Sequence, residues 1–280
     1  MKAACRLCGG PTMLLGNRGD VALHRCVVCR FVTGIPAVEK SASERYAHYQ
    51  SDSPPPDPEG RYREWLDAAE RRIGRGRLLE VGAGRGGFAR VALQRGWEVS
   101  ATEISRAGIE ALTSIGVAVF AGDVEAAGFA DGAFDFVTSL EVLEHLPKPG
   151  DHLRELHRIT RPGGLLLLTT PNFSGISRRA FGLRWRVIAS EHIGYFELRT
   201  LKKALLRAGY RTVGIRSRSL DISSWGRAPR GKPPEFDPVR SARMRDAVEG
   251  RAVLRAAKRA ANAVLGLSQL GDSLLVWAQR

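Results

Sequence analysis

The sequence lacks an apolar run long enough to span a bilayer, and no apolar segment follows Lys2 as it would in a signal peptide. We therefore expect a cytoplasmic chain, with peripheral attachment to the inner face of the membrane as the alternative. Acidic residues are a minority: 43 Lys and Arg stand against 29 Asp and Glu, which gives a net charge of +14. This excess favours polyanionic partners, such as nucleic acid, a membrane surface or a phosphorylated substrate. The arginine preference of a GC-rich genome would produce the same excess.

Cysteine is scarce, and all four cysteines fall in one pattern near the N-terminus. Cys5 and Cys8 form one C-x-x-C pair, Cys26 and Cys29 form another, and 17 residues separate the pairs. Two such pairs can place four thiolates around one Zn²⁺ in a closed, structural site. The spacing predicts a zinc ribbon over residues 1–35, with redox-active cysteine pairs as the alternative. What the ribbon binds cannot be read from this pattern.

A proline-rich stretch from Ser51 to Gly60 excludes a helix or a central strand there. We expect residues 36–60 to be a linker. A second domain would then occupy residues 61–280, with a helical insertion at about 218–271 before its last strand.

The second domain is organised around the glycine-rich run "LLEVGAGRGGF" at residues 78–88. Gly82, Gly84 and Gly87 fit G-x-G-x-x-G, which alone suggests a dinucleotide site. Glu80 argues against that interpretation, because an acid at the strand end would repel a pyrophosphate. A cationic ligand such as S-adenosylmethionine, with its ammonium and sulfonium groups, would gain from the same acid.

Two further acids follow the next two predicted strands. Glu103 lies 23 residues after Glu80 and is placed to accept both ribose hydroxyls of a nucleotide, the alternative being a mere neighbour of the helix start at Ser105. Asp123 is placed to accept from an adenine amino group. Strands at 77–81, 97–103, 117–121, 134–139 and 165–170 alternate with helices, which predicts an α/β doubly wound sheet whose ligand crevice lies at the carboxyl ends of the strands.

Several motifs agree in order and spacing with one family. The runs "LLEVGAGRGGFA", "ATEIS", "AGDVE", "FDFVTSLEVLEHLPKP", "RPGGLLLLTTPN" and "EHIGYFELRTLKKALLRAGY" resemble the class I S-adenosylmethionine-dependent methyltransferases, in the branch of the ubiquinone-type O-methyltransferases. The resemblance covers residues 60–217 and implies a mostly parallel seven-stranded sheet of order 3-2-1-4-5-7-6 with an antiparallel last strand near 272–278. It also implies that the cofactor is held by Glu80, Gly82, Ala83, Gly84, Glu103, Ile104, Asp123, Val124, Ser139, Leu140 and Glu141.

Two histidines are candidates for a catalytic base, because imidazole titrates near neutrality. His145 follows the fourth strand of the domain, and His192 lies on the acceptor side beyond the fifth. The alternative for each is a structural hydrogen bond, and family members carry "EH" at the position of His145 with a positioning role. Glu141 and His145 could share a metal, although two ligands on a short turn are weak evidence.

The predicted insertion contains a basic amphipathic helix at 240–267, with Arg251, Arg255 and Lys258 on one face. Such a helix can lie on an anionic membrane or meet a phosphorylated substrate. The alternative is a helix packed on the domain with a solvated basic face, since its apolar side is mostly alanine.

These observations favour a methyltransferase that O-methylates a small-molecule, sugar or lipid-linked acceptor by in-line transfer. The alternative is an RNA methyltransferase that uses the ribbon and the basic surface. Phe31 is the ribbon's only aromatic residue, so the ribbon offers no stacking platform for bases. The residues after the fourth strand also differ from the Asn/Asp-Pro-Pro-aromatic motif of enzymes that methylate base amines. A non-enzymatic scaffold would need a broken motif, and the glycine turn is intact.

Overall fold

A computed structural model of the chain describes residues 4–38, 58–219, 265–266 and 268–280. Most of the predicted linker and of the predicted insertion, including nearly all of helix 240–267, lies outside these residues. Within them, no helix combines the length and apolar character needed to cross a membrane.

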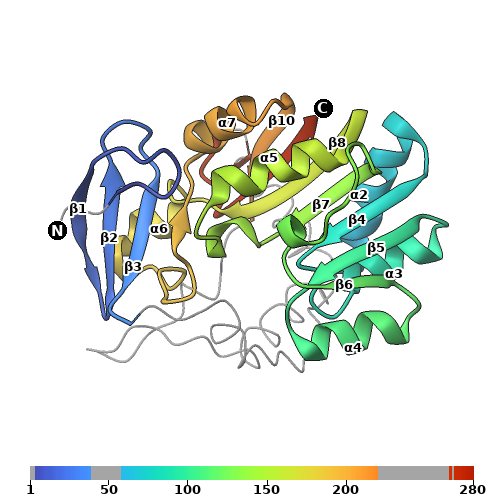
Figure 1. The fold of residues 1–280 in the computed structure, drawn as a ribbon. Helices are drawn as coiled ribbons and strands as arrows, with labels where there is room; N and C mark the ends of the chain where they lie inside the picture. Colours follow the sequence, from blue (N-terminus) through green and yellow to red (C-terminus); the bar gives the residue numbers. More distant parts are fainter. Residues whose placement is uncertain (1–3, 39–57, 220–264, 267) are drawn as a thin grey trace, which may run out of the picture. The chain divides into compact units, whose positions relative to one another are not determined.

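A seven-stranded sheet forms the centre of the second domain (Figure 1). Its order is β10-β11-β8-β7-β4-β5-β6. When the strands of this domain are numbered from its first strand, β4, and the sheet is followed from the β6 edge, this is the predicted order 3-2-1-4-5-7-6. The strands are β4 (Arg77–Val81), β5 (Glu98–Glu103), β6 (Ala118–Ala121), β7 (Phe134–Leu140), β8 (Thr160–Pro171), β10 (Arg211–Arg218) and β11 (Ser273–Gln279).

The pairing within this sheet confirms the predicted mixture of directions. Strands β4, β5, β6, β7 and β8 pair in parallel. The last strand is antiparallel to β8: Gly163 N–H donates to the carbonyl of Arg280 and Asn172 N–H to that of Asp272. Strand β8 begins five residues earlier than predicted, because its first residues already pair with β7 on one side and with the chain's last residue on the other.

Against the sequence analysis, a helix begins inside the proline-rich stretch, at Pro58, because the first turn of a helix tolerates proline. Helices alternate with the parallel strands, as the sequence pattern predicts. They are α2 (Pro58–Ile73), α3 (Gly87–Gln94), α4 (Arg106–Ser114), α5 (Pro149–Ile159) and α7 (Leu198–Arg207), with a short α6 (Ile176–Phe181) and 3₁₀ turns η1 (Val124–Ala126), η2 (Leu143–His145) and η3 (Gly182–Arg184). The apolar strand residues between them are buried, including Leu78, Leu79 and Phe136 at 0% exposure. Their removal from water is the main stabilising term of the sheet.

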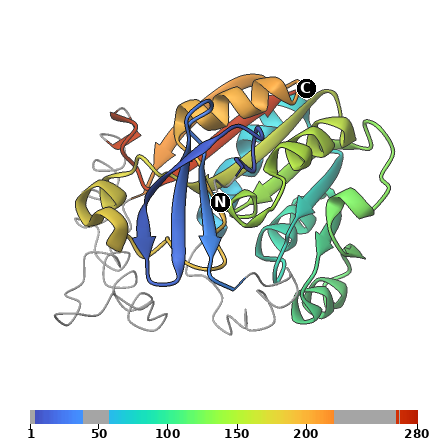
Figure 2. The same cartoon turned by 60° about the vertical axis from the view of Figure 1, so that its left-hand side comes forward.

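The N-terminal ribbon is an antiparallel sheet of β1 (Thr12–Arg18), β2 (Val21–Cys26) and β3 (Val32–Pro36). The three blue strands lie side by side in Figure 1 and in Figure 2. A fourth strand, β9 (Gly194–Tyr195), pairs with β3 through Val32 and Thr33. Because β9 comes from beyond β8, the ribbon sheet contains a strand that the sequence analysis does not predict.

The chain divides into two compact units. The ribbon unit contains residues 1–39, 170–201 and 215–275, and the main unit contains residues 40–169, 202–214 and 276–280. The core of the ribbon unit is built by Val21, Leu23, Val32, Phe173, Trp185, Ile188 and Tyr195. Four of these seven residues belong to the segment after β8, so the ribbon and that segment fold around a shared core.

Candidate active site and metal centre

Glu80 lies near the end of β4 and is almost fully buried, with 5% of its surface exposed. Its carboxylate accepts a hydrogen bond of 2.9 Å from the amide of Ala89, in the first turn of α3. The pKa of Glu80 is raised to about 8. Burial is the main cause and the charge of Glu103 adds to it, whereas the hydrogen bond from Ala89 lowers the pKa. Among the described residues no cation pairs with Glu80, so a cationic ligand would stabilise its ionised form.

The glycine turn after β4 requires glycine at particular positions. Gly82, Gly84 and Gly86 have φ of 64°, 54° and 74°, in the left-handed region that side chains with a Cβ rarely adopt. A Cβ on Gly82 would also lie 2.7 Å from a methyl group of Val142. The amides of Gly82 and Ala83 both donate to the carbonyl of Thr102 in β5, which fixes the turn against the neighbouring strand.

Glu103 is buried at the end of β5, and its carboxylate accepts hydrogen bonds from three backbone amides. It accepts from Gly84 at 2.7 Å, from Ile104 at 3.0 Å and from Ser105 at 2.8 Å. Ser105 itself caps α4 by accepting from the amide of Gly108. Glu103 therefore ties the glycine turn to the start of α4, and its predicted role toward ribose stays a prediction. Gly108, which the sequence analysis misses, has no room for a Cβ: such an atom would lie 2.7 Å from Glu103 Cγ.

Asp123 and Val124 follow β6, where Val124 is buried and begins η1. Burial, and secondarily the charge of Glu125, raises the pKa of Asp123. Glu125 lies 2.8 Å from Nδ1 of the buried His152 on α5. This pair anchors the turn behind the predicted adenine clamp, and sequence reasoning misses it because no spacing rule connects positions 125 and 152.

The segment after β7 carries a local backbone strain. Glu141 has φ of 55°, which is uncommon for a residue other than glycine, and its amide donates to both oxygens of Thr169 in β8. Ser139 is fully buried. Because β6, β5, β4 and β7 are neighbours in the sheet, their carboxyl ends bring together the predicted cofactor residues of the main unit.

The two candidate bases, His145 and His192, belong to the main unit and to the ribbon unit respectively. His145 ends η2, and its Nε2 lies 4.0 Å from the buried carboxylate of Glu144. His192, in the ribbon unit, donates from Nδ1 to the carbonyl of Val187 at 2.6 Å, so the ring's acceptor nitrogen is Nε2. Burial lowers the pKa of His192 to about 4, which keeps the imidazole neutral near pH 7. Among the described residues, Glu141 joins no cluster of three possible metal ligands, so a metal held by Glu141 together with His145 gains no support.

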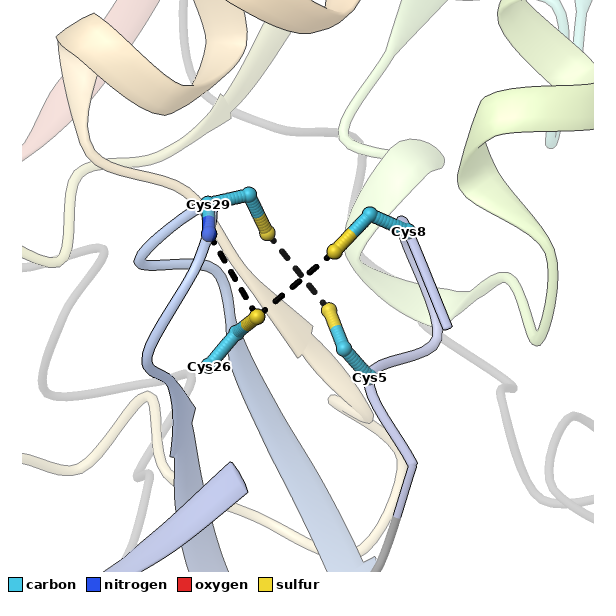
Figure 3. Close-up of side chains that lie close together, drawn as sticks. All are labelled: Cys5, Cys8, Cys26 and Cys29. Atoms are coloured by element: carbon cyan, nitrogen blue, oxygen red, sulfur yellow. Dashed lines mark hydrogen bonds between the residues drawn. The ribbon is translucent and has the colours of Figure 1, made fainter. Parts of the chain in front are cut away.

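The four cysteines converge on one point, as Figure 3 shows. Cys5 Sγ lies 3.6 Å from Cys29 Sγ, Cys8 Sγ lies 3.6 Å from Cys26 Sγ, and all four sulfur atoms lie within 4.8 Å of one another. Four thiolates at about 2.3 Å from a tetrahedral zinc would be about 3.8 Å apart, so the sulfur atoms fit that geometry.

The backbone around the cysteines also fits a metal-bound thiolate. The amides of Val28 and Cys29 both point at Cys26 Sγ, each at 3.4 Å. A Cβ on Gly10 would lie 3.4 Å from two of the sulfur atoms and 3.1 Å from Val28. The cysteines are unpaired as disulfides, and all but Cys8 are buried. The arrangement could hold one ion with no open coordination position.

Comparison with known proteins adds three findings. A methyltransferase domain family matches residues 49–214, more than half of the chain. The ubiquinone biosynthesis O-methyltransferase of Pseudomonas aeruginosa is 32% identical over 136 residues, which cover 46% of this chain and 56% of that protein. The malonyl-[acyl-carrier protein] O-methyltransferase of Serratia marcescens is 30% identical over 139 residues, covering 46% of this chain and 54% of that one. The chain thus spans about half the length of these relatives.

Solved structures show the same fold. A S-adenosylmethionine-dependent methyltransferase of Archaeoglobus fulgidus superposes with a TM-score of 0.54 at 18% identity, covering 79% of this chain and 92% of that one. One of Mesorhizobium loti gives 0.51 at 17% identity, with 78% and 96% covered. At these identities the likeness concerns the fold alone.

Proposed function

The chain belongs to the methyltransferase domain family, and from this premise we propose that it transfers the methyl group of S-adenosylmethionine to an oxygen atom of a small-molecule, sugar or lipid-linked acceptor. The observation that carries the proposal is Glu80. It is a buried carboxyl group that lacks a described cation partner, beside a glycine turn where a ligand can approach the backbone. A ligand with an ammonium and a sulfonium supplies the missing charge. A pyrophosphate would gain no charge partner from this carboxyl group.

The remaining cofactor contacts follow from the strand ends. We assign ribose to Glu103 and Ile104, adenine to Asp123 and Val124, and the methionine side to Glu80, Gly82, Ala83 and Gly84. Ser139, Leu140 and Glu141 would close the site. When bound, S-adenosylmethionine supplies a methyl group already activated by sulfonium, so that the protein chiefly has to align it with the acceptor.

His192 is assigned as the base that removes the acceptor's hydroxyl proton. Its ring is neutral near pH 7, and the bond from Nδ1 to Val187 leaves the lone pair on Nε2, which is the state that a base needs. His145, beside the buried Glu144, is assigned a positioning role. Both relatives described above are named as O-methyltransferases, which supports oxygen as the methylated atom.

Cys5, Cys8, Cys26 and Cys29 are assigned as ligands of a structural Zn²⁺. The ion would cross-link the ribbon and, through the pairing of β3 with β9, support the segment that carries His192. The RNA-directed alternative gains no support from the relatives reported, and attachment to a membrane through helix 240–267 stays a prediction.

The test is transfer of a labelled methyl group from S-adenosylmethionine into a host extract that is then split into RNA, lipid and small-metabolite fractions. Label in the metabolite or lipid fraction, unaffected by ribonuclease, is the expected result. Label in RNA would overturn the substrate class. Failure of the protein to bind S-adenosylmethionine would overturn the proposed function itself.

A further inference from the structure

Two arginine side chains lie over one buried aromatic ring in the ribbon unit. Phe173 follows β8 directly and is 4% exposed. The guanidinium carbon of Arg178, on α6, is 4.5 Å from the centre of this ring, and that of Arg25, on β2, is 5.7 Å from it. A ring face attracts one cation well, but two cations on one ring also repel each other. We call Phe173, Arg25 and Arg178 the Phe173 cluster.

The charges around the Phe173 cluster are not balanced by the described residues. Arg25 pairs with Glu197 at 2.8 Å, and Arg30 approaches the same carboxylate at 3.8 Å. Arg178 forms no ion pair within the described part of the chain. Burial, and secondarily the charge of Arg25, lowers the pKa of Arg178. A half-buried guanidinium in this position is costly unless an anion accompanies it.

Hydrogen-bond donors are also in excess around this ring. The Nε–H groups of Arg25 and Arg178 are buried and find no acceptor among the described residues. The same is true of the indole N–H of Trp185, a residue that is 0% exposed. Trp185 packs 6.3 Å from Phe173, centre to centre. Buried donors without acceptors are rare because each costs stability, and a ligand rich in acceptor oxygens would satisfy them.

We propose that the Phe173 cluster binds an anionic group of the methyl acceptor, either a carboxylate or a phosphate. The planar forks of Arg178 and Arg25 suit the oxygens of both groups. This inference rests on the proposed function, since the acceptor's reacting hydroxyl is assigned to His192. The rings of His192 and Tyr195 are 6.5 Å apart, and those of Tyr195 and Phe173 are 5.5 Å apart, so base and cluster belong to one aromatic array. An acceptor would present its hydroxyl at one end of this array and its anionic group at the other.

The experiment titrates the full-length, zinc-loaded protein with inorganic phosphate and, separately, with acetate. Sodium chloride holds the ionic strength constant, and the arginine Nε–H and tryptophan indole NMR signals report binding. The variants are R178Q, which removes the charge, R178K, which keeps it, and R179Q. R179Q is the matched control, because Arg179 is the exposed neighbour of Arg178 on the same helix. Binding of S-adenosylmethionine is measured on the same samples.

The expected result is saturable binding of at least one of the two anions, weakened at least tenfold in R178Q, less in R178K, and less than twofold in R179Q. Preference for phosphate or for acetate would identify the acceptor as phosphorylated or carboxylated. Absence of saturable binding in the wild type, or equal weakening in R178Q and R179Q, would overturn the inference. If the wild type did not bind S-adenosylmethionine, that result would instead count against the proposed function. Failure of the inference and failure of the proposed function are therefore distinguishable.

Discussion

At the scale of single residues, Glu80 carries both a stability cost and the proposed ligand charge. Its carboxyl group is buried and receives one amide hydrogen bond, which is too little to hold the ionised form at neutral pH. The protein therefore keeps an acid whose ionisation opposes folding. A cationic ligand beside it would turn this cost into binding free energy.

The first prediction concerns pH and Glu80. Its pKa rises from 4.5 to about 8 on folding. A raised pKa means that the group's stabilising contribution is fully present below pH 4.5 and is lost as the pH rises through 8. Glu80→Gln cannot ionise. The Tm of this variant minus the Tm of the wild type should therefore increase by several degrees as the pH rises from about 5 to about 9.

Thermal unfolding across that pH range checks the Glu80 prediction, with the exposed Glu98→Gln as the matched control. The control should track wild type at every pH. A constant difference between Glu80→Gln and wild type would show that Glu80 is ionised in the folded protein throughout.

The second prediction concerns His192. His192→Gln removes the base, and the rate of methyl transfer into the active extract fraction should fall by about 10²–10⁴-fold, with S-adenosylmethionine affinity unchanged. Because the pKa of His192 is lowered to about 4, the wild-type rate should show no loss from protonation of this ring between about pH 6 and pH 7.

His24→Gln, in the ribbon strand β2, is the control for His192 and should keep the wild-type rate. Equal losses in both variants would mean that His192 acts through the fold alone. A fall of the wild-type rate below pH 7 with an apparent pKa near 6.5 would contradict the buried, neutral state of the ring.

At the scale of elements, the pairing of β3 with β9 connects the cysteine centre to the segment that carries His192. Gly34 N–H donates to the carbonyl of Ile193 at 3.0 Å, and a Cβ on Gly34 would lie 2.8 Å from the carbonyl oxygen of His192. Thr200 also donates to the carbonyl of Cys29. These contacts hold the segment against the ribbon, and we infer from them a structural role for the proposed zinc site.

The third prediction follows from that connection. Removing the metal with a chelator, or by Cys5→Ser, should speed hydrogen exchange at least tenfold for the amides of Gly34 and Tyr195. The amides of β4 and β7, in the main unit, should keep their exchange rates and are the internal control. Unchanged exchange at Gly34 after complete metal removal would contradict the supporting role of the ribbon.

At the scale of the whole molecule, the sequence predicts the parts that depend on local patterns. The acids Glu80, Glu103 and Asp123 stand at consecutive strand ends, and the strand order and the antiparallel last strand follow the predicted topology. The four cysteines converge as their spacing indicates. Each of these features is encoded within a short window or in the order of elements, which is why sequence reasoning reaches it.

Contacts between distant segments escape that reasoning. Strand β9 has two residues and joins the ribbon across more than 150 positions, and Phe173 meets Arg25 across a similar separation. The pair of Glu125 and His152 likewise spans strand β7 and the 3₁₀ turn η2. No periodicity or motif marks such partners, because tertiary packing selects them.

The measurement that tests the central claim most directly is calorimetric titration of S-adenosylmethionine into wild-type protein and into Glu103→Ala. The account predicts one site in the wild type and a loss of about 1–3 kcal/mol of binding free energy in the variant, since the ribose hydroxyls lose their acceptor and Gly84 loses the carboxylate that holds it. Glu110→Ala, on the exposed face of α4, should bind like wild type. An affinity unchanged in Glu103→Ala, or no binding by the wild type, would contradict the assignment of the strand-end acids to this cofactor.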